Sequence, residues 1–353
     1  MAFRANRSSR PVAGTTMAAR PRTSDTTRTH STRVKPRRRS MSGIGSVRGA
    51  RALERTSDLD VHALARRLDP RIGDDVAAVR TRVRSVALKV DPTVEGVHFA
   101  RGLRDPRAIA RKAMRRPASD LAAAGAEPRF ALVALALPPG TTRDFARSLV
   151  RALAAAAREM GARLVGGHTG VRPGPLELNV TLVGECERPR RRSGARAGDR
   201  LLATGSFGGS ILAKHLRFRP RLRESRALAD GGIVVRAAID VSDGLALDAA
   251  RLASASRLAL ELDEASIPIA AAARSLARSD RESPLSHALR DGEDYELLLA
   301  IAPREVPRAL SVARRARFPL TVIGTFCRGR GLRLRRRTGR VETLRAAGFV
   351  HRA

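Results

Sequence analysis

The sequence of 353 residues contains no tryptophan, a single tyrosine and two cysteines. Aromatic residues make up 3% of the chain, too few to build the stacking platforms on which proteins hold single-stranded nucleic acids. The cysteines, Cys186 and Cys327, lack the spacing of a metal or redox motif, and we expect both to be free thiols. No apolar run approaches the roughly 18 residues that span a bilayer, so we expect a soluble, cytoplasmic protein without a membrane segment.

Acidic residues are also scarce, with 34 Asp and Glu against 68 Lys and Arg, and the formal net charge is +34. Such a charge is typical of proteins that bind nucleic acid, because Lys and Arg neutralise phosphates. Here the basic residues are almost all arginines spread through every segment, which indicates a bias of the whole chain and not a binding surface. We therefore expect no nucleic-acid partner except through a basic tail.

That tail is residues 1–50, which are rich in Arg, Ser and Thr and show no apolar periodicity, so we expect disorder there. A transit peptide and an overextended reading frame that truly begins at Met41 or later both explain it. The remaining chain is long enough for two domains. The connector rich in Pro, Arg and Gly near residue 190 predicts an N-terminal domain over 51–190 and a C-terminal domain over 191–353.

Strand and helix patterns mix in both halves, which predicts an α/β or α+β fold and not a helical bundle. Period-2 alternation predicts a strand at 176–185, and an amphipathic helix is expected to end at Gly161. The segment VEGVHF is expected to be extended, and GGHTG is expected to be a turn after a strand. Between them, DPRAIARKAM and SDLAAAGAEP are predicted to form two separate helices, the second beginning near Ser119 or Asp120.

Seven aspartates stand out because they lie among Gly, Ala and Val, where a solvated face of this chain would carry Arg. They occur in the segments IGDD, VDPTVEGVHF, ASDLAAAGAEP and IDVSDGLALD, and are Asp74, Asp75, Asp91, Asp120, Asp240, Asp243 and Asp248. Mg²⁺ is held by one or two carboxylates together with water and phosphates, and clustered carboxylates repel one another unless a cation neutralises them. The four segments together indicate a metal–phosphate site, although any single aspartate could instead be a helix cap or turn residue.

The order of the motifs resembles the thiamine-monophosphate kinase family, within the superfamily of aminoimidazole ribonucleotide synthetase. The resemblance runs from about residue 70 to 351 and is carried by IGDD, VDPTVEGVHF, RKAM with SDLAAAGAEP, GGHTG, RSGARAGD, TGSFGGS, IDVSDGL, DGEDYELL and a final GF-x-H. SDGL and GEDYEL together are fairly specific to the kinase, whereas GDD or a lone GG pair is a weak signal.

The resemblance implies a two-domain, synthetase-like fold whose N-terminal sheet domain binds ATP and Mg²⁺ and forms a homodimer. It also implies ATP-dependent phosphorylation of thiamine monophosphate to thiamine diphosphate by direct in-line transfer, with several Mg²⁺ ions. Phosphoryl transfer needs positioning and charge neutralisation, which suits a chain without a Ser-His-Asp or Cys-His signature. A related phosphotransferase with another small substrate, and a noncatalytic nucleotide- or polyanion-binding relative, stay open as alternatives.

The resemblance also implies a role for each matching position. The metal ligands would be Asp75, Asp91, Asp120, Asp240 and Asp243. The contacts to ATP would be Gly167, His168, Arg192 and Ser242, and the contacts to thiamine phosphate would be His98, Glu293 and Phe349. Each has a structural alternative: His98 could be a strand histidine with a satisfied hydrogen bond, Arg192 a solvated linker residue and Glu293 the start of a strand.

Some positions depart from the family pattern. His168 stands where the family has Asp, and a neutral imidazole is a poor ligand for Mg²⁺. Lys89 and Val90 replace small hydroxyl residues at expected ligand positions, although Lys89 could neutralise phosphate. Residues 115–117 (Arg-Arg-Pro) replace apolar residues and an Asn. These departures predict weaker metal binding, lower activity, an altered substrate or a catalytically silent relative.

Overall fold

The computed structural model describes residues 77–80 and 85–349, with side-chain surroundings from residue 85 onward. The basic tail and the IGDD segment with Asp74 and Asp75 lie outside the described residues, so the expectations for them stay predictions. Within the described part of the chain, no helix combines the length and the apolar character that a membrane crossing requires.

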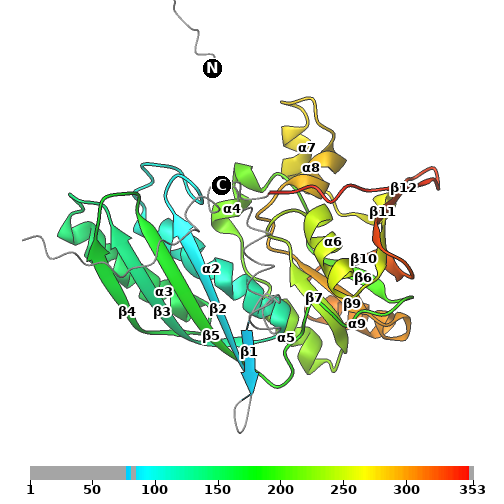
Figure 1. The fold of residues 1–353 in the computed structure, drawn as a ribbon, viewed down its shortest axis with the longest axis horizontal. Helices are drawn as coiled ribbons and strands as arrows, with labels where there is room; N and C mark the ends of the chain where they lie inside the picture. The colour runs from blue at the N-terminus through cyan, green and yellow to red at the C-terminus, as the bar shows by residue number, and fades with distance from the viewer. Residues whose placement is uncertain (1–76, 81–84, 350–353) are drawn as a thin grey trace, which may run out of the picture. The chain divides into compact units, whose positions relative to one another are not determined.

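A five-stranded sheet with the order β1-β2-β5-β3-β4 forms the first part of the described chain (Figure 1). Its strands are β1 (Ala77–Arg80), β2 (Ser85–Val94), β3 (Glu127–Leu137), β4 (Arg163–Val171) and β5 (Glu177–Cys186). Strands β3 and β4 pair in parallel and the other neighbours are antiparallel. Burial alternates strictly along β5, as its sequence period predicts, so one face of the sheet carries the core.

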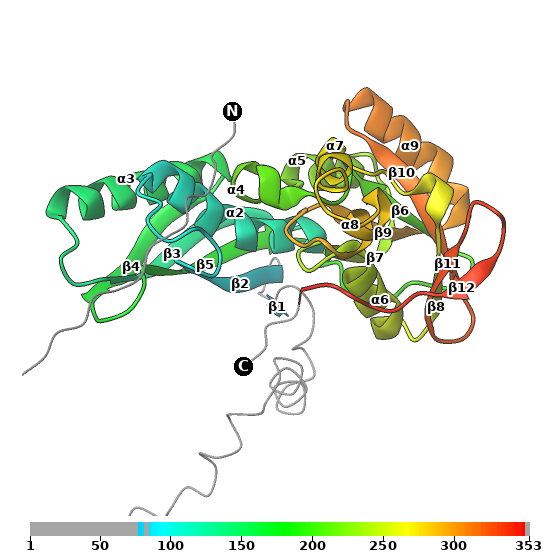
Figure 2. The ribbon, with the colours of Figure 1, turned by 90° about the horizontal axis from the view of Figure 1, so that it is seen from above.

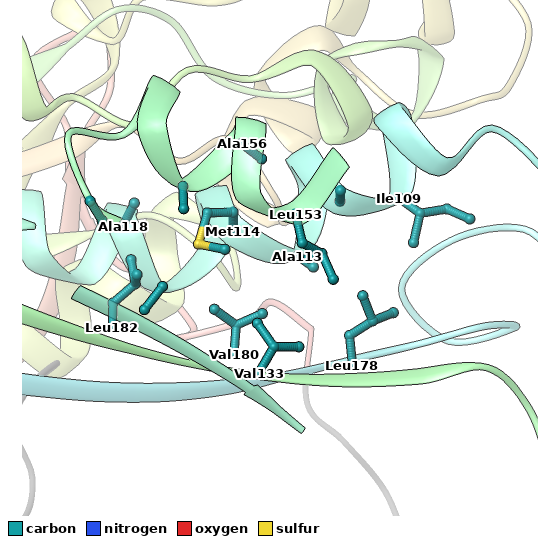
Figure 3. Packing of buried hydrophobic residues seen from close by; sticks show 14 of the residues in the cluster. Ile109, Ala113, Met114, Ala118, Val133, Leu153, Ala156, Leu178, Val180 and Leu182 are labelled. Carbon is teal, nitrogen blue, oxygen red and sulfur yellow. The ribbon is translucent and has the colours of Figure 1, made fainter. Parts of the chain in front are cut away.

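Two helices, α2 (Pro106–Ala124) and α3 (Arg143–Glu159), cover that face (Figure 2). Asp105 is the N-cap of α2, and its carboxylate accepts a hydrogen bond from the Arg107 amide at 2.9 Å. Met114 of α2 and Leu153 of α3 pack with Val133 and Val180 of the sheet, as Figure 3 shows. Burial of these apolar side chains, with Ala87 of β2 in the same cluster, holds α2 against this face of the sheet.

The prediction of two separate helices between residues 105 and 125 was wrong, because α2 runs through Pro117 without a break. A proline inside a helix removes a hydrogen bond and costs about 3 kcal/mol. Most residues of α2 are buried, and burial offsets that cost. Asp120 consequently lies inside a long helix and is not a helix cap, whereas the predicted stop at Gly125 is confirmed by a left-handed C-cap (φ 72°).

Two further local predictions were wrong. The segment GGHTG is not a turn, because β4 pairs with β3 along its whole length, with Gly167 opposite Val133. A Cβ on Gly167 would lie 2.1 Å from the Val133 carbonyl oxygen, so only glycine fits this close approach. The extended pattern of VEGVHF also ends early: β2 stops at Val94, and His98 lies in the turn that follows.

A seven-stranded sheet with the order β12-β11-β8-β10-β6-β9-β7 follows. Its strands are β6 (Arg200–Thr204), β7 (Val235–Asp240), β8 (Ala259–Asp263), β9 (Leu297–Ile301), β10 (Leu320–Cys327), β11 (Gly331–Arg335) and β12 (Val341–Thr343). The helices are α4 (Lys214–Arg217), α5 (Leu222–Asp230), α6 (Leu245–Ala255), α7 (Ala271–Leu276), α8 (Pro284–Arg290) and α9 (Val306–Arg315). Short 3-10 turns are η2 (Ser210–Leu212), η3 (Glu264–Ser266) and η4 (Pro303–Glu305).

Both faces of this sheet are covered. Leu298 of β9 lies in a cluster with side chains of α6 and α8, and Leu299, which points to the opposite face, lies in a cluster with α5 and α9. Ala122 and Ala123, at the end of α2, belong to the second cluster. Helix α2 therefore packs against both sheets. The mixed α/β fold class is confirmed, and the boundary near residue 190 stays a prediction.

Candidate active site

The two acidic motifs of the second half lie side by side because their backbones extend the ladder between β7 and β9. Beyond Asp240, the last residue of β7, the Tyr295 amide donates to the Val241 carbonyl at 2.7 Å. The Glu293 amide then donates to the Ser242 carbonyl at 2.6 Å. Backbone pairing thus brings IDVSDGL and DGEDYELL to the same end of the sheet.

The second of these loops is conformationally strained. Glu293 and Tyr295 have φ values of 63° and 53°, in the left-handed region that residues other than glycine rarely adopt. Such residues cost about 1–3 kcal/mol each and cluster at functional sites, where the surroundings hold them in place. A Cβ on Gly292 would lie 2.8 Å from the Ser242 carbonyl oxygen, so the neighbouring loop leaves little room for another conformation.

Asp91 and Asp120 come from different elements and share one ammonium group. Lys89 Nζ lies 3.4 Å from Asp91 Oδ1 and 3.1 Å from Asp120 Oδ2. Lys89 and Asp91 are on the face of β2 that α2 covers, and Asp120 points from α2 towards them. The side chains of the two aspartates are only 15% and 10% exposed, so the three charges interact in a partly desolvated place.

Asp240 joins the same region through Ser119, the neighbour of Asp120 on α2. The Ser119 hydroxyl donates to Asp240 Oδ2 at 2.5 Å, and both residues are buried. This hydrogen bond ties the end of β7 to α2. Asp240 is therefore bound to the residue next to Asp120 on α2, although the two aspartates are 120 residues apart in the sequence.

Tyr295, the only tyrosine of the chain, lies at the centre of these charges. Burial raises its pKa well above the usual value, Arg116 acts in the opposite direction, and Glu293, Asp91 and Asp240 raise it further. The phenol therefore stays protonated, and its hydroxyl donates to Glu293 Oε1 at 3.3 Å. Three predicted site carboxylates thus act on one buried hydroxyl group.

Two cations of α2 balance part of this negative charge. Lys112, whose side chain is fully buried, lies 2.7 Å from Glu293 Oε1 and 3.0 Å from its Oε2. Burial lowers the pKa of Lys112 and the Glu293 carboxylate opposes that shift. Arg116 donates to the Pro92 carbonyl. Burial disfavours the charge of Arg116, but its interactions with Tyr295 and then Asp91 outweigh burial and raise its pKa.

Asp243 belongs to a separate set of contacts. Arg251 binds Asp243 Oδ2 and lies 2.7 Å from Asp248 Oδ1, while Asp248 Oδ2 accepts from the Asp243 amide at 2.9 Å. Burial and the charge of Asp243 raise the pKa of Asp248 to about 7. Asp248 is fully buried and holds the SDG loop in shape, so the structural alternative is supported for this residue.

The described residues do not complete a metal site. In the ranges 77–80 and 85–349, no group of three or more His, Cys, Asp or Glu side chains could hold a metal ion. Asp91 and Asp120 form a pair of carboxylates, which is the number Mg²⁺ commonly takes from a protein. The ammonium of Lys89 lies between these carboxylates, however, and leaves no place there for a metal ion that bridges them.

Gly167 and His168 are not close to Asp91 within one chain. The register places Asp91, Val180, Val133 and Gly167 opposite one another on β2, β5, β3 and β4. Three interstrand spacings separate Asp91 from Gly167, or about 14 Å at roughly 4.8 Å each. Ligands of one Mg²⁺ lie about 2.1 Å from it, so these two positions of a single chain cannot share an ion.

A cavity of about 310 Å³ lies beside β4, lined by Leu153, Leu164, Gly167, His168 and neighbouring residues of β3 and α3. Its lining is mostly apolar and contains none of the aspartates discussed above. We therefore do not place the phosphates of a nucleotide in this cavity.

The remaining predicted residues lie on segments close to these loops. Ser242 follows β7 by two residues. Arg192 lies beside this edge strand, because the linker runs along it and the Arg191 carbonyl accepts a hydrogen bond from the Ala238 amide at 2.9 Å. The Phe349 amide donates to the Asp243 carbonyl at 2.8 Å, and its side chain is 53% exposed. The C-terminal segment is thereby attached to the SDG loop with the phenyl ring partly open to solvent.

His98 accepts a hydrogen bond from the Val94 amide at its Nδ1, over 3.0 Å. An accepting Nδ1 carries no proton, so the proton of the neutral imidazole is on Nε2. The structural alternative, a histidine with a satisfied hydrogen bond, is therefore supported for the Nδ1 atom. The histidine lies in a turn and not in a strand as that alternative assumed.

Sequence reasoning missed Lys112, Tyr295 and Arg251. Tyr295 had a usable signal, since it is the only tyrosine and lies inside GEDYEL. Lys112 had a weaker one, as a lysine on the buried side of a helix in a chain whose basic residues are mostly arginines. Nothing in the sequence distinguishes Arg251 from the other arginines.

Family models for the AIR synthase related protein match the chain twice, with the N-terminal domain at residues 73–186 and the C-terminal domain at 194–337. The thiamine-monophosphate kinase of Rhodopirellula baltica is 38% identical over 289 residues, which cover 79% of this chain and 90% of that protein. The thiamine-monophosphate kinase of Escherichia coli is 33% identical over 282 residues, covering 72% and 82%.

Solved structures agree with these relatives. AaThiL complexed with AMPPCP and TMP superimposes with a TM-score of 0.73 at 26% identity, covering 84% of this chain and 97% of that one. Thiamine monophosphate kinase from Aquifex aeolicus gives 0.68 at 26% identity, covering 78% and 95%. E. coli HypE, a hydrogenase maturation protein, shares the fold at a TM-score of 0.63 and 22% identity, with 75% and 87% covered.

Proposed function

The chain belongs to the thiamine-monophosphate kinase family, and we propose that it transfers the terminal phosphate of ATP to thiamine monophosphate, forming thiamine diphosphate. One observation carries this proposal beyond family membership. Asp91 from β2, Asp120 from α2, Asp240 from the end of β7 and Glu293 from the loop before β9 converge around Lys89 and Tyr295. Lys89, Lys112 and Arg116 offset part of this negative charge, and the remaining repulsion between the carboxylates favours a site that also binds a cation.

In the proposed reaction, a phosphate oxygen of thiamine monophosphate attacks the γ-phosphorus of ATP, and ADP leaves from the opposite side. Mg²⁺ bound with ATP would neutralise phosphate charge, and Asp75, Asp91, Asp120, Asp240 and Asp243 are the carboxylates we propose to hold it. The chain's own contribution is positioning, which is the main requirement of phosphoryl transfer. Helix α2 supplies it through the Ser119–Asp240 and Lys112–Glu293 contacts.

The substrate contacts are also proposals. Ser242, with Gly167 and Arg192, would bind ATP, the guanidinium acting as a phosphate clamp. Glu293 and His98 would hold the thiamine phosphate, and the partly exposed ring of Phe349 would give its heterocycle an apolar face. Glu293 is already paired with Lys112, so its carboxylate has a defined position before a substrate arrives.

We further propose that the protein works as a homodimer through the face of the five-stranded sheet opposite α2 and α3. That face exposes large apolar side chains: Leu88 (38%), Val90 (57%), Phe130 (37%) and Leu132 (41%). The register places them in neighbouring rows of the sheet, so they form one patch. A second copy would cover it, and only a second copy could bring Gly167 and His168 towards Asp91.

The direct test is to incubate the purified protein with ATP, Mg²⁺ and thiamine monophosphate and to measure thiamine diphosphate by chromatography. We expect product from the wild type, strong loss in Asp120→Asn, and wild-type activity in Asp230→Asn, which neutralises an exposed carboxylate on α5. Absence of product where a reference enzyme of the family turns over would refute the proposal. ATP consumption with other acceptors would then indicate a different phosphotransferase.

A further inference from the structure

The position of Lys89 is unusual for a metal-dependent phosphotransferase. Its ammonium lies between the carboxylates of Asp91 and Asp120, at 3.4 Å and 3.1 Å, and its side chain is 23% exposed. It lies on the core-facing side of β2, the side on which Ala87 and Thr93 are fully buried. A lysine on such a side needs charged partners, because burial without them disfavours the ammonium.

A second cation acts on one carboxylate of this pair. Arg116 lies four residues before Asp120 on α2, one helical turn away. Its charge interacts with Asp91, and this interaction helps to keep the buried guanidinium charged. The positive charges of Lys89 and Arg116 therefore offset part of the negative charge of this pair without any ion.

A divalent ion bridging Asp91 and Asp120 would have to displace the Lys89 ammonium, since both need the same carboxylate oxygens. The ammonium is tethered, so it competes at a high effective concentration. Each carboxylate has a second oxygen that these two contacts with Lys89 leave for another ion. The conflict concerns the bridging position alone.

We propose that Lys89 is a built-in cation that replaces one divalent ion between Asp91 and Asp120, so that this chain takes up one fewer divalent ion than a site without the lysine. This inference rests on the proposed kinase function for its purpose but not for its test. Lys89 acts here as a positioning residue: it holds the carboxylates of β2 and α2 together whether or not nucleotide is bound.

The test measures Mn²⁺ binding to the full-length protein by electron paramagnetic resonance, without nucleotide and then with AMPPCP. Lys89→Met removes the charge and keeps an unbranched side chain of similar length. We expect this variant to bind one more Mn²⁺ per chain than the wild type. Its affinity for Mn²⁺ at that place should be at least about tenfold higher than that of the wild type. Lys89→Arg keeps the charge and should gain none. Arg147→Met, on the exposed side of α3, controls for the lower net charge and should also gain none.

A double variant locates the extra ion. Lys89→Met combined with Asp120→Asn should lose the gained Mn²⁺, because only one carboxylate of the pair remains. The same extra ion should stabilise Lys89→Met against heat, with a larger rise of Tm on adding Mn²⁺ than the wild type shows. That shift is read without any turnover.

The inference is overturned if Lys89→Met and Arg147→Met bind Mn²⁺ alike, or if the gain survives the loss of Asp120. If Lys89→Met does not fold, Lys89→Thr is the second variant, and recovery of folding by Mn²⁺ supports replacement of an ion. Failure of both variants to fold with or without Mn²⁺ overturns it. Binding is measured apart from product. If the wild type forms no thiamine diphosphate while Lys89→Met still gains Mn²⁺, the proposed function is refuted and this inference stands.

Discussion

The buried pair of Lys112 and Glu293 allows a quantitative prediction about the site. Lys112 has no exposed side-chain surface, whereas the side chain of Glu293 is 29% exposed. The two single replacements therefore leave different charges behind. Glu293→Gln leaves an ammonium without its carboxylate partner in a buried place, and Lys112→Met leaves a carboxylate that water can reach.

The magnitude follows from those environments. At 2.7 Å the attraction is about 6 kcal/mol with an effective dielectric constant of roughly 20, and desolvation opposes it. Loss of one partner of a buried pair typically costs about 3–5 kcal/mol. Removing the proton from a lysine of ordinary pKa costs about 5 kcal/mol at pH 7. This value is an upper bound on the cost of leaving Lys112 without its partner, because the side chain can become neutral instead. We expect Glu293→Gln to cost about 3–4 kcal/mol and Lys112→Met about 1–2 kcal/mol.

The assay is urea denaturation, with the change in midpoint at constant m reporting the free energy of unfolding. The double variant should be more stable than Glu293→Gln alone, because the stranded ammonium is removed. The deficit of Glu293→Gln should shrink from pH 7 to pH 9: with the folded pKa of Lys112 below the unfolded one, the unfolded state binds more protons, so stability rises with pH.

Arg226→Met is the matched control, since Arg226 pairs with Asp230 at 3.5 Å on the surface and should change stability by at most about 0.5 kcal/mol. The reasoning would be refuted if Glu293→Gln were no more destabilising than Lys112→Met, or if its deficit did not depend on pH.

Three further predictions concern the rest of the chain. Burial opposes the charge of His287, but its hydrogen bonds to the carboxylates of Asp280 and Asp291 raise its pKa above 6.5. The stability that the charged imidazole contributes is therefore complete below pH 6.5 and is lost as pH rises through the raised pKa. The free energies of unfolding of wild type and His287→Asn should differ at pH 6 and converge by pH 8.5. His168→Asp should tighten Mg²⁺ dependence of product formation severalfold, and an unchanged Mg²⁺ profile would contradict the ligand assignment. Gly348→Ala should raise the KM for thiamine monophosphate, since its Cβ would lie 2.2 Å from the Asp243 carbonyl oxygen, whereas Gly339→Ala, with open space around it, should not.

The fold class and many strands could be predicted because hydrophobic periodicity records local burial. Strand β5 alternates between buried and partly exposed residues as its sequence does. The continuous helix through Pro117 could not be predicted, because its stability comes from packing against two sheets that the local sequence does not contain. The same holds for GGHTG, where pairing with β3 decides the conformation.

The candidate site was predictable to the extent that motifs identify a family. The resemblance named Asp91, Asp120 and Asp240, and these residues meet where α2 faces β2 and β7. It did not predict that Lys89 would lie between two of them, because only the geometry of β2 and α2 shows that the lysine reaches both. Asp248 lies among small and apolar residues in the sequence, as the expected ligands do, but its buried carboxylate binds Arg251. The sequence alone does not distinguish a metal ligand from such a structural aspartate.

The central claim is that carboxylates from distant segments act together on the phosphates of ATP. Uptake of Mn²⁺ that depends on added AMPPCP tests it most directly, measured on the wild type and on Asp91→Asn, Asp120→Asn and Asp240→Asn with folding checked by circular dichroism. We predict that the wild type takes up Mn²⁺ together with AMPPCP and that each variant loses most of this uptake. Equal uptake by the wild type and all three variants would contradict the account.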